Sequence, residues 1–266
     1  MTGKDFSDFV VLVTGASTGL GRAIAVETAA RGARAVIVNY AHSADAAQET
    51  ARQVEALGAE ARLVRGNVAS DEDCRQIVAA ASSLGRIDAL FNNAGITKAA
   101  RHDDLDAVSG QDFLDLYAVN VVGAYQMIRA ARSLLEAAPQ PGAVVNTSSI
   151  AGVTGVGSSV PYAASKGALT TMTLSLARAL APKIRVNAVC PGFIDTPWFD
   201  KLMPVEEIEK IRARSAAAAP LKAASKAEDI APAAVFLASP ASRHVTGETL
   251  LVDAGTHLGF APLIAR

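Results

Sequence analysis

The stretch VVLVTGASTGLG, residues 10–21, sets the interpretation of the whole chain. Its first four residues are apolar without interruption, which suits a strand that is buried on both faces. The glycines that follow, Gly15, Gly19 and Gly21, permit a tight turn and a close approach of the main chain to a pyrophosphate. A helix from about residue 20 then directs its free N–H groups at the phosphates. A tight turn without a ligand is the alternative, but the position between a first strand and a first helix favours cofactor binding.

Apolar runs like the first one recur along the chain, separated by alanine-rich segments with helical spacing. This alternation is typical of a doubly wound parallel sheet with right-handed crossovers. No linker, charge block or repeat divides the chain. We therefore expect an α/β fold: a single Rossmann-type domain over residues 1–266 with a seven-stranded parallel sheet. The expected strands are residues 10–13, 35–39, 61–64, 87–91, 143–148, 184–189 and 249–253, and the expected helices are 20–31, 43–57, 71–84, 104–137, 161–181 and 228–238.

A long segment, residues 192–227, interrupts the alternation between the sixth and seventh expected strands. It contains a charged helical stretch, VEEIEKIRAR, and the only tryptophan of the chain, Trp198. The segment follows the carboxyl end of a parallel strand, where such sheets bind ligands, and insertions of this length are usually functional. We expect a partly apolar lid over the substrate, although the same side chains would also serve to pack the insert on the core. The apolar residues concerned are Trp198, Phe199, Leu202 and Met203.

The helix after this insert is expected to begin near residue 228. Ser225 and Glu228 have the spacing of a capping box, but Pro232 follows closely. A start near residue 228 places the proline in the first turn, where its missing N–H is tolerated.

Composition and charge exclude several classes of protein. The chain has 266 residues, 50% of them hydrophobic, and a formal net charge of −1. No apolar run approaches the roughly 18–20 residues that cross a bilayer, and no basic patch indicates nucleic acid or an anionic membrane. The only cysteines, Cys74 and Cys190, are far apart in the sequence, and no Cys/His cluster has zinc-like spacing. We expect a cytoplasmic protein with no metal site and with neither a nucleic-acid nor a membrane partner.

The end of the second strand indicates which dinucleotide binds. An acidic residue there would hold the adenosine ribose as a diol and repel a 2′-phosphate. This chain instead has Asn39, followed by Tyr40, His42 and Ser43. This favours NADP(H) over NAD(H), although Thr18 stands in the loop where an arginine would complete a phosphate clamp. Alternatively, His42 and Ser43 only begin an exposed helix, with Ser43 as its N-cap.

Four polar residues are candidates for catalysis. Tyr162 and Lys166 stand four residues apart in YAASK, so they share one face of a helix. Reduction of a ketone by hydride needs a proton for the forming alkoxide, and a nearby ammonium lowers the pKa of a phenol from its usual value of about 10. Ser149, after the fifth strand, can hold the substrate oxygen. Asn120 lies inside a long helix at a propensity cost, which suggests a role such as holding a water for proton relay.

With these motifs in place, the chain resembles the short-chain dehydrogenase/reductases from about residue 8 to 256. The resemblance implies a catalytic tetrad, with Tyr162 as acid and base, Lys166 as its activator and ribose ligand, Ser149 as substrate anchor and Asn120 as water-relay and structural residue. It also implies that Asn93 to Gly95 line the adenosine side. The matching motifs are TGASTGLG, NNAG at 92–95, Asn120, NTSSIAG, YAASK and PGFIDT at 191–196.

The resemblance extends the expected cofactor contacts to other loops. Ile194 and Thr196 are implied to contact the carboxamide, and Asn67 stands where the family often has an aspartate against the adenine amino group. The residues expected at the cofactor are Gly15, Ser17, Thr18, Gly19, Leu20, Gly21, Asn39, Tyr40, His42, Ser43, Asn67, Val68, Asn93, Ala94, Gly95, Tyr162, Lys166, Pro191, Gly192, Ile194 and Thr196.

The expected function is therefore an NAD(P)-dependent oxidoreductase that transfers hydride between nicotinamide and a small-molecule carbonyl or secondary alcohol, in the ketone-reducing direction. The NY pair at 39–40 is shared with 3-oxoacyl-carrier-protein reductases, which is the alternative for the substrate. Alternatives of other classes are an inactive cofactor sensor or scaffold, disfavoured by the presence of Tyr162 and Lys166, and an epimerase or dehydratase, disfavoured by the lack of a substrate domain. The family implies a homotetramer or homodimer with helices near 104–137 and 161–181 at the interface.

Overall fold

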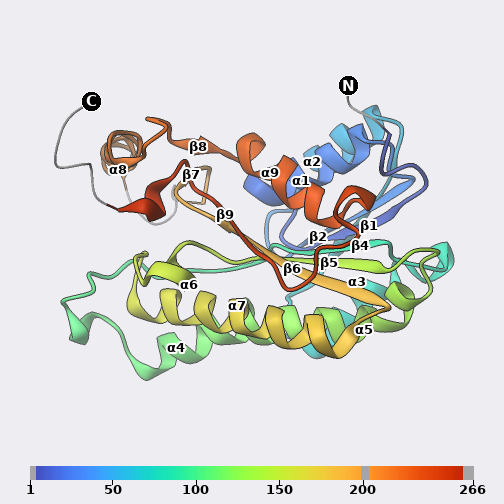
Figure 1. The fold of residues 1–266 in the computed structure, drawn as a ribbon, viewed down its shortest axis with the longest axis horizontal. Coiled ribbons are helices and arrows are strands. Elements are labelled where there is room, and N and C mark those ends of the chain that lie inside the picture. The colour runs from blue at the N-terminus through green and yellow to red at the C-terminus, as the bar shows by residue number, and fades with distance from the viewer. Residues whose placement is uncertain (1–3, 199–203, 260–266) are drawn as a thin grey trace.

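The computed structural model describes residues 4–198 and 204–259, and the expected apolar runs lie in one parallel sheet (Figure 1). The strands of this sheet are β1 (Val10–Val13), β2 (Ala35–Tyr40), β3 (Glu60–Arg65), β4 (Ala89–Asn92), β5 (Gly142–Thr147), β6 (Ile184–Pro191) and β9 (Thr249–Val252). Their order is β3-β2-β1-β4-β5-β6-β9, and every neighbouring pair is parallel. The expected doubly wound sheet of seven strands is thus confirmed. Its winding reverses between β1 and β4, the type of position at which such sheets bind ligands.

Helices cover both faces of the sheet, which explains why its central strands are apolar throughout. Figure 1 shows α1, α2 and α9 over one face and α3, α5 and α7 over the other. Ile24 and Ile230 lie in the core on the first side, and Ile77 and Met127 lie in the core on the second. None of the helices in the described ranges is long and apolar enough to cross a membrane. The α-helices are α1 (Gly19–Ala30), α2 (Ala44–Ala56), α3 (Asp71–Ala79), α4 (Gly110–Tyr117), α5 (Ala124–Glu136), α6 (Ala151–Thr154), α7 (Val160–Leu180), α8 (Val205–Ala218) and α9 (Ala227–Ala238).

The single helix expected over 104–137 is three consecutive segments. The first, α4, begins only at Gly110, because Ser109 and Asp112 form a capping box that starts the helix there. A π-helical segment, η3 (Ala118–Gly123), then separates α4 from α5. Wide turns of this kind are frequent at functional sites, and this one contains Asn120.

Two other helix boundaries differ from expectation. The helix expected over 71–84 ends at Ala79, and a short 3₁₀ turn, Ser82–Leu84, follows it. Helix α9 begins at Ala227, so Pro232 lies in its second turn rather than its first. Ser225 does not cap this helix, because it pairs with Ile194 in a small two-stranded sheet of β7 (Ile194–Asp195) and β8 (Ser225–Lys226). The other 3₁₀ turns are Leu105–Ala107, Pro240–Ser242 and Thr256–Leu258.

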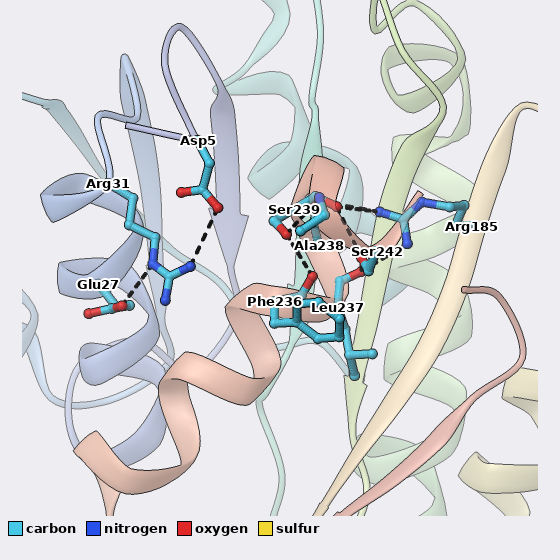
Figure 2. A network of polar contacts seen from close by, with 10 residues as sticks. Asp5, Glu27, Arg31, Arg185, Phe236, Leu237, Ala238, Ser239 and Ser242 are labelled. Carbon is cyan, nitrogen blue, oxygen red and sulfur yellow. Dashed lines mark hydrogen bonds and ion pairs between the residues drawn. The ribbon is translucent and has the colours of Figure 1, made fainter. Parts of the chain in front are cut away.

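At the amino edge of the sheet, a buried arginine holds the end of α9 in place (Figure 2). Arg185 of β6 donates to the main-chain carbonyls of Leu237, Ala238, Ser239 and Val245 at 2.9–3.3 Å. The carbonyl groups at a helix C-terminus carry partial negative charge, which compensates the charge of the buried guanidinium. Burial nevertheless lowers the pKa of Arg185 from its usual value. This polar cluster stabilises the edge that lies opposite the predicted site.

Candidate active site

The loop between β1 and α1 is shaped by contacts with the end of β4. Gly15 and Gly19 adopt φ angles of +62° and +55°, in the left-handed region that favours glycine. Gly21 has no room for a side chain, because a Cβ there would lie 2.4 Å from the carbonyl oxygen of Gly15 and 2.5 Å from Nδ2 of Asn93. That Nδ2 donates to the carbonyls of Thr14 and Gly15, at 3.1 Å each. The glycines thus let the loop turn tightly into the N-terminus of α1, which is a suitable place for a phosphate.

Asn39 supports this loop from inside the protein. Its side chain is buried, its Oδ1 accepts a hydrogen bond from the Gly15 N–H at 3.2 Å, and its Nδ2 donates to the carbonyls of Val64 and Gly66. An aspartate at this position could not donate those two bonds. The amide at position 39 therefore has a structural reason, and the first side chain beyond it that is not buried belongs to Tyr40.

Asn120 connects three segments around the carboxyl edge of the sheet. Its Oδ1 accepts from the N–H of Ile96 at 2.9 Å, while its Nδ2 donates to the Ile96 carbonyl and to the hydroxyl of Ser165, both at 3.0 Å. Ser165 in turn donates to the carbonyl of Tyr162 at 2.8 Å. The amide thus joins the π-helical segment and the loop after β4 to the helix that carries Tyr162.

Tyr162, Lys166 and Ser149 meet at the start of α7. Ser159 is the N-cap of this helix, and its hydroxyl accepts the N–H of Tyr162. Ser149 lies close enough to the Tyr162 hydroxyl to lower its pKa, and Nζ of Lys166 lies 5.7 Å from the centroid of the Tyr162 ring. This Nζ also donates to the carbonyl of Thr147, the last residue of β5, at 2.8 Å. The four candidate catalytic residues are therefore brought together by β5, η3 and α7.

Burial dominates the pKa values of the two titratable groups. It raises the pKa of Tyr162 to about 12, against an opposing hydrogen bond from Ser149. It also lowers the pKa of Lys166 to about 8. The expectation that Lys166 lowers the phenol pKa is not met in this arrangement, because desolvation of the phenolate outweighs the other influences. The geometry therefore presents Tyr162 as a protonated phenol at neutral pH.

The lowered pKa of Lys166 predicts a pH-dependent stability. The unfolded chain keeps this proton up to about pH 10.5, whereas the folded chain loses it near pH 8, so the lysine contribution to stability improves as pH rises between these values. Replacing Lys166 with Met removes this pH-dependent contribution. The free energy of unfolding of Lys166→Met, minus that of the unmodified protein, should therefore be larger near neutral pH than at about pH 9.5. Urea denaturation of both proteins at the two pH values measures this, with Lys183→Met, which removes an exposed lysine, as control. A difference that does not change with pH would contradict the prediction.

Gly95 lies among the candidate catalytic residues. The implied position on the adenosine side would instead require this glycine to lie apart from them. A Cβ at this glycine would lie 3.2 Å from Oδ1 of Asn120, 3.6 Å from Nζ of Lys166 and 3.5 Å from Cη2 of Trp198. Asn93, by contrast, contacts the loop of residues 14–18 between β1 and α1, called the phosphate loop below, as does Ala94, whose N–H donates to the hydroxyl of Thr14. The NNAG motif thus spans the distance between the phosphate loop and the candidate catalytic residues.

The other expected cofactor residues are distributed around the same edge. Thr18, Gly19 and Thr196 contribute to a pocket of about 430 Å³ between the first turns of α1 and α9. Ser43 is the N-cap of α2, but its side chain accepts no capping hydrogen bond, and His42 beside it is exposed. The main-chain carbonyl of Ser17 accepts a hydrogen bond from the side chain of Arg22. Leu20 and Val68 are buried, one in each core, whereas Asn67 is exposed. Pro191 is the last residue of β6, Gly192 lies against Asp253, and Ile194 is the first residue of β7.

The insert over 192–227 is closed at its base. Strands β7 and β8 pair its two ends, Asp195 lying opposite Lys226. Helix α8 contains the expected charged stretch, and Arg212 of this helix makes a two-point ion pair with Asp195, at 2.8 and 2.9 Å. Trp198 lies over Gly95, whereas Phe199, Leu202 and Met203 fall outside the described residues.

Three hydroxyl residues that support the site were not singled out from the sequence. Besides Ser165, these are Ser148, which donates to the carbonyl of Lys166 at 3.0 Å, and Thr170, which shares a hydrogen bond with Ser148. The signal was available: Ser165 and Thr170 follow Tyr162 and Lys166 at helical spacings of three and four residues.

Known proteins resemble this chain over nearly its whole length. A family model described as enoyl-(acyl carrier protein) reductase matches residues 15–257. The chain is 40% identical to a proposed ketoacyl reductase of the granaticin polyketide synthase of Streptomyces violaceoruber, over 94% of this chain and 96% of that one. It is 38% identical to an L-rhamnose 1-dehydrogenase (NAD(P)(+)) of a Sphingomonas species, over 93% and 96%. The crystal structure of a proposed short-chain dehydrogenase/reductase from Burkholderia xenovorans superposes with a TM-score of 0.86 at 39% identity, over 95% and 99%.

The sheet, the phosphate loop and the tyrosine–lysine helix together define a dinucleotide-dependent oxidoreductase of the Rossmann type. The chain belongs to the short-chain dehydrogenase/reductase family. As a member of this family, it is an oxidoreductase that acts on carbonyl and CH–OH groups with a nicotinamide cofactor.

Proposed function

We propose that this chain reduces a ketone of a small-molecule substrate with NADPH, using Tyr162 as the proton donor. The observation that supports this most directly is the convergence of Tyr162, Ser149 and Lys166 on one point at the carboxyl edge of the sheet. A phenol with a pKa of about 12 is protonated at neutral pH, which suits a donor in the reducing direction.

The residues present fit a bound nicotinamide dinucleotide. The absence of a Cβ at Gly21 and Gly15 lets the main chain fold tightly at the N-terminus of α1, where pyrophosphate would be held. Lys166 would hold the nicotinamide ribose, and Gly95 leaves space beside it. When bound, the cofactor supplies the hydride for the carbonyl carbon.

The protein residues then manage the proton and the oxygen. Ser149 donates a hydrogen bond to the carbonyl oxygen, and the Tyr162 hydroxyl transfers its proton to that oxygen as negative charge develops there. The nearby Lys166 ammonium stabilises the phenolate that is left. Asn120 fixes the distance between α7 and the loop that follows β4, through its bonds to Ser165 and Ile96. A panel of ketones and secondary alcohols, assayed with both cofactors by nicotinamide absorbance, tests the reaction; absence of turnover on every substrate would contradict it.

The proposed preference for NADPH rests on the absence of an acid after β2. Because Asn39 is buried against the loop, the partly buried Tyr40 is the next position at which an acid would act on the cofactor. NADPH should bind about tenfold more tightly than NADH, and Tyr40→Asp should reduce or reverse this ratio by repelling the 2′-phosphate. Titration of each reduced cofactor, followed by nicotinamide fluorescence, gives both dissociation constants. Tighter NADH binding by the unmodified protein would contradict the preference.

Three further features of the function are proposed. The insert over 192–227 would cover the substrate, which is supported by the Asp195–Arg212 ion pair and by the place of Trp198 over Gly95. A homotetramer or homodimer is supported by exposed apolar side chains on η3, α4, α5 and α7, and light scattering would test it. The exposed apolar residues on these helices are Leu114, Val122, Tyr125 and Leu174.

A cytoplasmic location is supported by two cysteines that are both free and buried. A 3-oxoacyl-carrier-protein substrate is the alternative supported by the ketoacyl reductase relative.

A further inference from the structure

We propose that Arg65, the last residue of β3, binds the 2′-phosphate of NADPH and so determines which of the two dinucleotides the protein prefers. This inference rests on the proposed function, because it assumes that the adenosine ribose lies at the end of β2. The phosphate loop has Thr18 and no arginine, and the loop after β2, residues 41–43, has no arginine either. A guanidinium from the neighbouring strand would supply the cation that both loops lack.

Arg65 lies beside the end of β2 because the two strands are parallel neighbours. In their register Tyr40 is the partner of Arg65, and each is the last residue of its strand. Paired residues project from the same face of a sheet, so Arg65 is next to the position at which an acid would repel the 2′-phosphate. Asn67, an expected contact of the adenine, follows two residues later. The register therefore places Arg65 at the adenosine end of the expected cofactor site.

The guanidinium of Arg65 reaches across to the loop after β2 and keeps most of its donors free. Its Nε donates to the main-chain carbonyl of Ala41 at 3.3 Å. Within residues 4–198 and 204–259, its two terminal nitrogens have no hydrogen-bond partner and no carboxylate forms an ion pair with it. The side chain is exposed, so these nitrogens are open to a ligand. Two free nitrogens of one guanidinium match two oxygens of one phosphate.

Arg22 fixes the distance between the two segments that would enclose this phosphate. Its Nη2 donates to the carbonyl of Ser17 in the phosphate loop at 2.7 Å and to the carbonyl of Ala46 in the first turn of α2 at 3.0 Å. Its Nε donates to the hydroxyl of the buried Thr50 at 3.0 Å. Segments that are already fixed lose little freedom when a ligand binds, so the phosphate site does not have to be ordered first.

The other polar groups near Arg65 permit an anion there. His42 is exposed and the hydroxyl of Ser43 accepts no capping hydrogen bond, and both residues follow directly on the carbonyl to which Arg65 is bonded. Asp45, the acid in the first turn of α2, is exposed, so water screens its charge. Both carboxylate oxygens of Asp73, on α3, accept hydrogen bonds from neighbouring residues. A phosphate bound to Arg65 thus has donors beside it in the loop after β2.

The test compares adenosine 2′,5′-bisphosphate with adenosine 5′-monophosphate, which differ only in the 2′-phosphate. Calorimetric titration should show tighter binding of the bisphosphate by the unmodified protein. Arg65→Gln should raise the Kd of the bisphosphate about ten- to thirtyfold and that of the monophosphate less than about twofold. Arg65→Lys keeps the charge but loses the planar fork, so its Kd for the bisphosphate should be intermediate.

Arg52→Gln is the matched control for these variants. It removes the same charge from an exposed arginine of α2 that pairs with Glu49, and it should change neither Kd. An unchanged preference for the bisphosphate in Arg65→Gln would overturn the inference. An equal loss of both nucleotides would also overturn it, because Arg65 would then contact the adenine or the ribose instead.

Nucleotide binding needs no ketone, which separates this inference from the proposed function. If Arg65→Gln loses the preference for the bisphosphate while no ketone is reduced by the unmodified protein, the proposed reaction fails and the role of Arg65 stands. If ketones are reduced and Arg65→Gln keeps the preference, the role of Arg65 fails and the reaction stands. If the unmodified protein binds both nucleotides equally well, the role of Arg65 fails together with the preference for NADPH.

Discussion

Replacing Tyr162 with phenylalanine is expected to lower kcat by about 100- to 10,000-fold and to leave the dissociation constant of the cofactor almost unchanged. The substitution removes only the hydroxyl on which Ser149 acts, while the ring keeps its place beside Gly157. The proposed proton donor is lost, but the phosphate loop and Lys166 stay in place. Steady-state kinetics and a fluorescence titration with the reduced cofactor measure the two quantities separately.

A matched control for this substitution is Tyr125→Phe. Tyr125 lies on α5 and is 45% exposed, so the same change of phenol to phenyl is made away from the site. This variant should retain the full rate, and thermal denaturation should show that both variants are folded. A Tyr162→Phe protein with a normal rate would remove the acid–base assignment.

The second large effect is expected from Gly21→Ala, which should weaken cofactor binding at least about tenfold and destabilise the fold by about 1–3 kcal/mol. The new Cβ would lie 2.4 Å from the Gly15 carbonyl oxygen and 2.9 Å from Cα of Ala16, which are backbone atoms and cannot rotate away. Relief therefore requires the phosphate loop to move away from α1. Urea denaturation and cofactor titration give the two values.

Gly110→Ala is the control for the glycine substitution. Gly110 is the first residue of α4, and a Cβ at this position would meet no atom within 4 Å. Alanine also has the higher helix propensity, so stability and cofactor binding should be unchanged or slightly improved. If both alanine variants bound the cofactor as the unmodified protein does, close packing at Gly21 would not be needed for the loop.

Most of the fold could be predicted because its signals are local. Each apolar run overlaps a strand of the sheet, since burial on both faces selects continuous apolar residues wherever a parallel strand forms. The alternation with helical segments then leaves few arrangements of the sheet. One boundary was wrong because of a contact between segments: Ser225 pairs with Ile194 and so does not cap α9. The late start of α4 instead has a local cause, the capping box of Ser109 and Asp112, whose spacing was present in the sequence.

The tertiary structure decided how the predicted site residues are used. Asn39 and Gly15 are 24 residues apart, and no local pattern indicates that the amide turns inward to hold the loop. Asn120 likewise bonds to Ile96 and Ser165 from different segments, and Gly95 was placed beside the tetrad only by the folded chain. Such contacts depend on the packing of distant segments and leave no periodicity in the sequence.

Tyr162 and Lys166 illustrate both kinds of information. Their four-residue spacing alone determined that a phenol and an ammonium share one helix face, because helical geometry is a local property. Only the folded protein determined their protonation, since burial raises the pKa of the phenol to about 12 and lowers that of the ammonium to about 8. Desolvation depends on everything that surrounds a group, and the sequence near a residue does not contain its surroundings.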